Sequence, residues 1–176
     1  MSQGDTVIPL LIEVLRTYAP VLVPGAIVVS ALIGALIALI SVRHHREVAR
    51  KRATLDVILR SEGGEFRTIT ETFQRISDSP EGLLAILNPD TDPRPESDDY
   101  YEVQAYLNHY ELVAIGIKQG IIDATFYKAW MKTNLVADWN TSRPLISEVR
   151  NNWKAAFRNW EELAVSWGGE PLENSN

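Results

Sequence analysis

The polar residues with the strongest potential for chemistry are Asn108 and Glu111, three positions apart in an otherwise apolar stretch. Residues at that spacing lie side by side on one face of a helix. A carboxylate next to a carboxamide could serve as a catalytic pair. A structural cluster is the favoured interpretation, because buried polar groups need polar partners. We expect the two residues to be partly buried and structural, with Arg150 or Lys154 as the partner of Glu111.

Other candidates for catalysis or metal binding have the wrong spacing. His44 and His45 are adjacent and point about 100° apart on a helix, so they suit one metal ion poorly, and the RHHREV segment lacks the histidine spacing of zinc proteases. The segment from Asp90 to Asp92 resembles the start of a calcium loop, but Pro95 replaces its glycine and Tyr101 its final glutamate. We expect no catalytic residue, no metal site and no cofactor.

The sequence also lacks two kinds of feature, and their absence excludes several classes of site. The sequence contains no cysteine, which excludes disulfides, thiolate zinc sites and a cysteine nucleophile. It also has no phosphate-binding glycine loop and no nucleophile elbow. His109 is isolated, and its place on the polar strip of its helix predicts exposure to solvent.

The elements that would position these residues follow a membrane anchor. Residues 21–42 form a run of 22 residues without charge. At about 1.5 Å per residue the run spans roughly 33 Å, enough for a hydrocarbon core about 30 Å thick. We therefore predict a single transmembrane helix. The first fifteen residues hold no Lys or Arg, which argues against a cleaved signal peptide.

A basic cluster follows the run and predicts the orientation of the anchor. The ten residues after Val42 carry a net charge of +4, and the basic ones are Arg43, Arg46, Arg50, Lys51 and Arg52. The segment before the run has a net charge of −1. Because positive flanks stay in the cytoplasm, we predict an inner-membrane protein with its N-terminus outside and its C-terminal domain in the cytoplasm. The cluster should also contact anionic lipid head groups.

The first twenty residues allow two interpretations. Apolar residues from Val7 to Tyr18 recur at helical spacing. They predict either a short interfacial helix that ends at Pro20 and Pro24, or an extension of a tilted anchor.

The remainder predicts an all-α domain. Residues 43–61 should form a basic juxtamembrane helix, residues 62–167 a bundle of about five helices, and residues 168–176 a disordered tail. The expected helices cover residues 65–77, 80–87, 99–119, 123–139 and 144–167, with a loop at 88–99. From Ala53 onward the chain has 11 basic and 20 acidic residues, a net charge of −9, which argues against nucleic-acid binding.

Two helices have informative faces. Helix 99–119 carries one long apolar face, and Leu112 and Ile115 lie opposite it beside Asn108 and Glu111, so we expect the helix to be central to its domain. In helix 144–167 the residues Trp153, Trp160 and Trp167 are seven apart and would form one aromatic ridge. Such a ridge packs against a neighbouring helix or presents a surface to a partner or to lipid.

The segment from Tyr106 to Asn140, YLNHYELVAIGIKQGIIDATFYKAWMKTNLVADWN, resembles a family of small bacterial and phage-associated proteins, the domain of unknown function 4760. The resemblance extends over about residues 46–167. It rests on Tyr106-Leu107-Asn108, Glu111, Gly116, Gly120, Asp123, Tyr127, Trp130 and Trp139. The resemblance implies a helical cytoplasmic domain behind a single anchor and supplies no catalytic residues.

We interpret the chain as a non-enzymatic interaction module that holds a protein partner at the inner membrane. The alternatives are a phage-exclusion or defence effector that acts at the membrane, and an enzyme that uses Glu111 and Asn108. Small residues recur every four positions along the anchor and could also pair two copies of the chain in lipid. They are Ala26, Ser30, Gly34 and Ala38.

Overall fold

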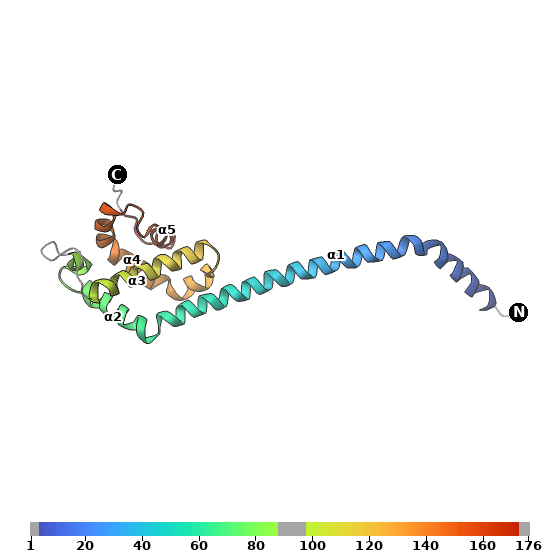
Figure 1. The fold of residues 1–176 in the computed structure, drawn as a ribbon, viewed down its shortest axis with the longest axis horizontal. Helices are drawn as coiled ribbons and strands as arrows, with labels where there is room; N and C mark the ends of the chain where they lie inside the picture. Colours follow the sequence, from blue (N-terminus) through green and yellow to red (C-terminus); the bar gives the residue numbers. More distant parts are fainter. Residues whose placement is uncertain (1–3, 88–97, 173–176) are drawn as a thin grey trace. The chain divides into compact units, whose positions relative to one another are not determined.

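The computed structural model describes residues 4–87 and 98–172, and all regular structure in them is helical. The elements are α1 (Gly4–Ser61), α2 (Gly64–Ser77), the 3₁₀ helix η1 (Gly82–Leu87), α3 (Asp98–Lys118), α4 (Ala124–Asn152) and α5 (Arg158–Ser166) (Figure 1). The predicted all-α class is confirmed. The chain divides into two compact units, residues 1–48 and 49–176.

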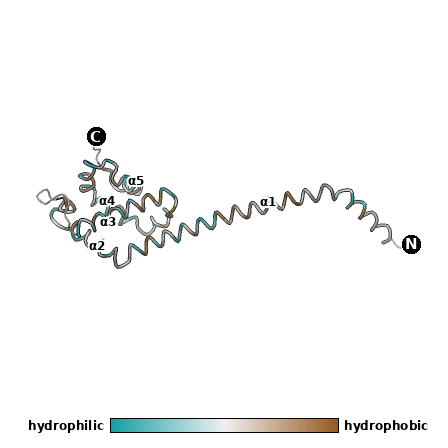
Figure 2. Tube along the Cα trace, in the orientation of Figure 1, coloured by the Kyte–Doolittle hydropathy of each residue, from teal (hydrophilic) through white to brown (hydrophobic). Residues whose placement is uncertain are grey.

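Helix α1 carries the apolar run. It continues without interruption through Pro20 and Pro24, so of the two interpretations of the first twenty residues, the short helix that ends at these prolines is wrong. Its most apolar 18-residue window, within Pro24–Ser61, has a mean hydropathy of 2.6, and no side chain of that window is buried. Figure 2 shows this apolar stretch of α1. Among the described residues, α1 is the one helix long and apolar enough to cross a membrane.

The predicted positions of α2, η1 and α3 agree with the structure within about three residues. The chain turns at Glu62 and Gly63, and α2 then follows. Phe66 and Phe73 of α2 stack on Tyr106 of α3, with ring centroids 5.8 and 4.1 Å apart. The loop between η1 and α3, including the calcium-loop candidate Asp90-Thr91-Asp92, lies outside the described residues.

Helix α4 contradicts the predicted break at residues 140–142. It begins at Ala124, and the Asp123 side chain caps it by accepting a hydrogen bond from the Phe126 N–H. It then runs to Asn152 with Pro144 inside. A proline within a helix loses one hydrogen bond. The residues just after it, Leu145 and Ile146, are fully buried, and this packing offsets the loss.

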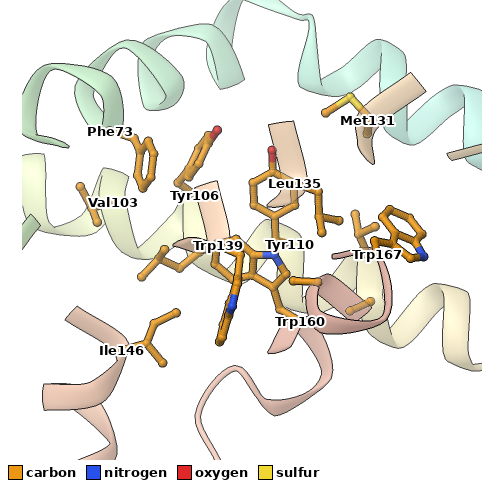
Figure 3. Close-up of a cluster of buried hydrophobic side chains, with 14 of the residues drawn as sticks. Phe73, Val103, Tyr106, Tyr110, Met131, Leu135, Trp139, Ile146, Trp160 and Trp167 are labelled. Atoms are coloured by element: carbon orange, nitrogen blue, oxygen red, sulfur yellow. The ribbon is translucent and has the colours of Figure 1, made fainter. Parts of the chain in front are cut away.

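The core of the second unit lies between α2, α3, α4 and α5. Its largest buried side chains include Trp139, Trp160, Tyr127 and Phe73. Figure 3 shows Trp139, Trp160 and Tyr110 gathered in the centre of this core. The long apolar face of α3 packs here as predicted, with Val103, Tyr106 and Leu107 buried.

The opposite face of α3 leaves Leu112 and Ile115 exposed, although Glu111 on the same face contacts α5. Leu112 is 68% exposed and Ile115 is 37% exposed. The prediction that α3 is packed on both sides is therefore wrong. The helix forms one wall of the domain, and its outer face carries these two apolar side chains into solvent.

Residues 168–172 are held against the core, although the sequence predicted a disordered tail from residue 168. The Trp139 Nε1–H donates to the Glu170 carbonyl oxygen at 2.7 Å, and the Leu172 N–H donates to Glu161 at 3.0 Å. Arg143 also pairs with the Glu170 carboxylate. These contacts hold the segment against α4 and α5, while residues 173–176 lie outside the described part.

Candidate functional site

Glu111 caps a helix instead of pairing with a cation. Its carboxylate accepts hydrogen bonds from the backbone N–H groups of Asn159 (3.3 Å) and Trp160 (2.8 Å) and from the Asn159 Nδ2 (2.7 Å). These are free N–H groups in the first turn of α5, which has no side-chain cap of its own. A carboxylate is favoured there because the helix dipole places positive charge at the N-terminus. Glu111 therefore contacts the last helix, but its partners are N–H groups of Asn159 and Trp160 and not Arg150 or Lys154.

Arg150 was a candidate partner of Glu111 and has a different one. Its guanidinium forms an ion pair with Glu161 at 2.7 Å, and its Nε–H donates to the Ala156 carbonyl oxygen at 2.9 Å. Both contacts fix the turn that joins α4 to α5. Lys154, the other candidate, lies in this turn and is exposed.

The turn between α4 and α5 contains a strained residue. Phe157 has a φ of 54° and a ψ of 30°, the left-handed conformation. That conformation costs a residue other than glycine about 1–2 kcal/mol. The contacts of Arg150 on one side and Glu111 on the other hold the backbone in place. These hydrogen bonds fix the conformation of the turn. Residues 153, 155, 156 and 157 of the turn form one wall of a groove.

This groove, which we call the Trp153 groove, has a volume of about 770 Å³. Ligand sites commonly have volumes of about 300–1,000 Å³ and combine an apolar lining with a few polar groups. The groove is bounded by η1, α3, the end of α4 and the α4–α5 turn. Its aliphatic lining consists of Ile86, Leu87, Val103, Leu107, Leu145, Val149, Ala155 and Ala156.

Asn108 and Glu111 both line the groove, yet they play different roles. Asn108 is exposed, so the prediction that it is partly buried is wrong. Gln104, Asn108 and Asn152 stand along the groove and make no hydrogen bond to another described residue. Glu111 is partly buried as expected, and its oxygens face α5. The pair therefore combines one structural carboxylate with one accessible carboxamide.

The predicted tryptophan ridge does not form, because its members lie on separate elements. Trp160 and Trp167 pack into the core, with exposed fractions of 0% and 8%, while Trp153 follows the end of α4 and is 65% exposed. The seven-residue spacing would align them only on one continuous helix. Trp153 is thereby free to border the groove.

A buried acidic cluster escaped the sequence reasoning. The Asp138 carboxylate accepts hydrogen bonds from the hydroxyls of Tyr106 (2.8 Å) and Tyr110 (2.7 Å). Burial raises the pKa of Asp138, although both hydrogen bonds oppose that shift. Burial also raises the pKa of both tyrosines, so their hydroxyls stay protonated donors. Position 138 lies 28 residues from Tyr110, and no local pattern joins them.

The histidines differ in environment. His44 and His45 are exposed, with ring centroids 6.4 Å apart, and the described residues contain no group of three or more potential metal ligands. His109 packs on Phe66 with ring centroids 4.5 Å apart, and its Nε2 is buried without a partner among the described residues. Burial lowers the pKa of His109 to about 4. Its predicted exposure to solvent is therefore wrong.

Arg50 of the basic cluster is bound within the second unit. The Arg50 guanidinium lies 2.8 Å from the Asp123 carboxylate, and the Asp123 N–H donates to the Thr54 hydroxyl at 2.7 Å. The α3–α4 turn is thus fixed to the last part of α1. The other four basic residues of the cluster have side chains exposed to solvent, where a lipid surface could reach them. They are Arg43, Arg46, Lys51 and Arg52.

Loss of the Glu111 carboxylate should destabilise the second unit. In Glu111→Ala, two N–H groups of α5 lose their acceptor, and we expect the free energy of unfolding of residues 49–176 to fall by about 1–3 kcal/mol. Urea unfolding followed by tryptophan fluorescence measures the change. Glu162→Ala, which removes an exposed glutamate of the same helix, should stay within about 0.5 kcal/mol of the parent. A Glu111→Ala fragment as stable as the parent would favour a catalytic role.

A comparison with protein families gives a match. The family model described as a domain of unknown function, DUF4760, matches residues 28–167, which is 140 of the 176 residues. Neither the curated proteins nor the solved structures gave a match.

Proposed function

The chain belongs to the DUF4760 family, a domain of unknown function. We propose that it is a membrane-anchored interaction module that holds a protein partner at the inner membrane. The anchor is the apolar part of α1, and the partner site is the Trp153 groove. The observation that carries the proposal is an exposed tryptophan at the edge of an apolar groove whose α4–α5 wall is held by hydrogen bonds. Tryptophan is enriched among the residues that dominate binding energy at protein interfaces.

The walls of the groove support this role. Protein partners bind most tightly to surfaces that need little reordering. Glu111 and Arg150 fix the α4–α5 turn through contacts of 2.7–3.3 Å, and the strained Phe157 is part of the wall they hold. The same contacts weaken the catalytic alternative, because they occupy the carboxylate that would have to act.

Photocrosslinking tests the proposal. The photoreactive residue benzoyl-phenylalanine is placed at position 153 of the full-length protein in membranes of its native cells. We expect discrete adducts to one protein, identified by mass spectrometry. Position 130 is the control, because Trp130 is 64% exposed, close to the 65% of Trp153, but does not line the groove. Absence of adducts at position 153, or equal adducts at both positions, would count against the groove as the partner site.

The orientation of the anchor is open to a separate test. The charge difference between the flanks, −1 before the run and +4 after it, favours a C-terminal domain in the cytoplasm. A green fluorescent protein fused to the C-terminus should fluoresce, and alkaline phosphatase fused there should be inactive. Moving the five basic residues ahead of Val21 should weaken or invert this result. Active phosphatase at the C-terminus of the unaltered chain would overturn the orientation.

We also propose that the anchor pairs two copies through Ala26, Ser30, Gly34 and Ala38. A Cβ atom added to Gly34 meets no atom of its own chain within 4 Å, so the fold of one chain does not require glycine there. In Gly34→Ile, the larger side chain should keep the helices apart and abolish crosslinking of the isolated anchor. Gly25→Ile is the matched control, because Gly25 is not one of the four small residues that recur every four positions. Unchanged crosslinking in Gly34→Ile would show that these four residues do not form the interface.

A further inference from the structure

The turn between α3 and α4 presents an isoleucine to solvent on a hydrogen-bonded backbone. Gly120 follows α3 with a φ of 69°, and the N–H groups of Ile121 and Ile122 both donate to the Gly116 carbonyl oxygen, at 2.9 and 3.1 Å. Ile122 packs inward and is 6% exposed, whereas Ile121 is 60% exposed. Because these hydrogen bonds fix the turn, the side chain of Ile121 is kept on the surface.

Two more apolar side chains are exposed in the first turns of α4. Phe126 and Trp130 are four residues apart, so they lie on one face of the helix, and they are 38% and 64% exposed. Apolar surface residues that are scattered singly need no explanation, whereas Ile121 and these two fall within ten positions of the chain. We call Ile121, Phe126 and Trp130 the Ile121 patch.

The segment that carries the Ile121 patch is basic, although its domain is acidic. Of the 11 basic and 20 acidic residues from Ala53 onward, three basic residues and one acidic residue lie in residues 118–132. The acidic residue, Asp123, is 6% exposed and pairs with Arg50 at 2.8 Å. The net positive charge therefore comes from three lysines, which are Lys118, Lys128 and Lys132.

These lysines suit the Ile121 patch to one kind of surface. All three are exposed, although Lys118 pairs with Glu162 at 2.9 Å and the Lys128 Nζ lies 5.5 Å from the centre of the Trp167 ring. Lysines beside exposed aromatic and aliphatic side chains are typical of protein surfaces that lie on a bilayer with anionic lipid. The acidic remainder of the domain is repelled by such a bilayer.

Contacts with α1 place this segment at the start of the second unit. The Asp123 carboxylate binds Arg50, and the Asp123 N–H donates to the Thr54 hydroxyl at 2.7 Å. Arg50 is the eighth residue after the apolar run ends at Val42, and eight residues rise about 12 Å in a helix such as α1. The head groups extend about 5–8 Å beyond the hydrocarbon core on each side. The Ile121 patch thus belongs to the end of the unit that follows the proposed anchor.

We propose that the Ile121 patch rests on the anionic lipid surface beside the anchor. The side chain of Ile121 enters the head-group region, and the three lysines face lipid phosphates. Trp153 follows the last residue of α4, about 44 Å along this helix from its start, so the lipid contact leaves the Trp153 groove open. This inference rests on the proposed anchor and adds a second membrane contact, which the folded domain makes.

Fluorescence quenching by lipids tests the proposal with the full-length protein, which contains no cysteine. Ile121→Cys and Trp153→Cys are each labelled with the fluorophore NBD and reconstituted into vesicles of phosphatidylcholine and the anionic lipid phosphatidylglycerol. Lipids with a nitroxide on the head group quench NBD at the bilayer surface. We expect at least about threefold more quenching at position 121 than at position 153. The two positions are matched, because Ile121 is 60% exposed and Trp153 is 65% exposed.

A charge reversal tests the role of the anionic lipid. Lys132→Glu should reduce the quenching at position 121 by about half, because an anionic surface attracts lysine and repels glutamate. Lys154→Glu is the matched control, since Lys154 is equally an exposed lysine but lies beyond the far end of α4. It should leave the quenching within about a tenth of the parent, because salt screens charges over about 10 Å. Vesicles of phosphatidylcholine alone should reduce the quenching in the parent as Lys132→Glu does.

Other outcomes overturn the inference. Equal quenching at positions 121 and 153 would contradict it, and so would quenching that neither Lys132→Glu nor uncharged vesicles reduce. A blue shift of NBD at position 121 without nitroxide quenching would show that protein, such as a second copy of the chain, covers the Ile121 patch.

A probe in the apolar run separates this inference from the proposed function. Ile33→Cys carries NBD in the middle of the run, where nitroxides on the lipid acyl chains should quench it. If position 33 is quenched and position 121 is not, the anchor holds and the lipid contact of the domain is wrong. If position 33 is not quenched, the proposed membrane anchor itself fails.

Discussion

Trp160→Ala should lower the free energy of unfolding of residues 49–176 by about 3–5 kcal/mol, the usual cost of truncating a buried tryptophan. Trp160 is fully buried and stacks on Tyr110, with ring centroids 4.8 Å apart and planes 19° apart. It also meets the edge of Trp139 at 5.4 Å. Small domains have total stabilities of about 5–15 kcal/mol, so this loss removes a large share. Urea unfolding monitored by far-UV circular dichroism measures it.

Trp153→Ala provides the control for that experiment, because it removes the same side chain seven residues earlier. Trp153 is 65% exposed, so its removal should change the free energy of unfolding by less than about 0.5 kcal/mol. The contrast tests the separation of the two residues by the α4–α5 turn. Equal losses in both variants would show that the two tryptophans lie in one packed ridge after all.

Asp138→Ala should also destabilise the second unit strongly. The hydroxyls of Tyr106 and Tyr110 both donate to Asp138, and each would lose its acceptor inside the core. A buried donor without a partner costs about 1–3 kcal/mol, so two of them should cost about 2–6 kcal/mol. Chemical unfolding of the parent and the variant at pH 7 gives the difference. Asp56→Ala is the control, because Asp56 is exposed and its loss should change the stability little.

The raised pKa of Asp138 makes the free energy of unfolding depend on pH, and the direction of this dependence follows from the shift. Its carboxyl group keeps its proton more tightly in the folded chain than in the unfolded chain, where the pKa is about 4. Stability from this group is therefore present at low pH and lost as pH rises through the raised folded pKa. The carboxamide introduced by Asp138→Asn would accept the same hydroxyl bonds without titrating. We expect Asp138→Asn to gain stability relative to the parent as pH rises from 4 to 7.

His109 changes stability in the opposite direction over the same interval. Its pKa is lowered to about 4 in the folded chain, so protonation of the unfolded chain destabilises the fold as pH falls below about 6.5. Both Asp138→Asn and the parent contain His109, and its effect cancels in their difference. A difference between them that stays constant from pH 4 to 7 would contradict a raised pKa at Asp138.

The sequence by itself determined the features that arise from neighbouring residues. Composition alone identifies the charge-free run that is long enough to span a bilayer. The turn at Gly63 and the helix cap at Asp123 depend on contacts within a few positions along the chain. The buried face of α3 is equally local, because the periodicity of a helix alone places Val103, Tyr106 and Leu107 together. Residues that act within one element can be predicted from that element.

Only the tertiary structure decided how separate elements meet. Burial of Leu145 and Ile146 keeps α4 helical through Pro144, and this moves the chain break to residues 153–157. The same shift separates Trp153 from Trp160 and creates the wall of the groove. The partners of Glu111 and Asp138 lie 48 and 28 residues away, at distances along the chain where no periodicity operates. Such contacts depend on packing between helices, which is set by the whole core and not by any one segment.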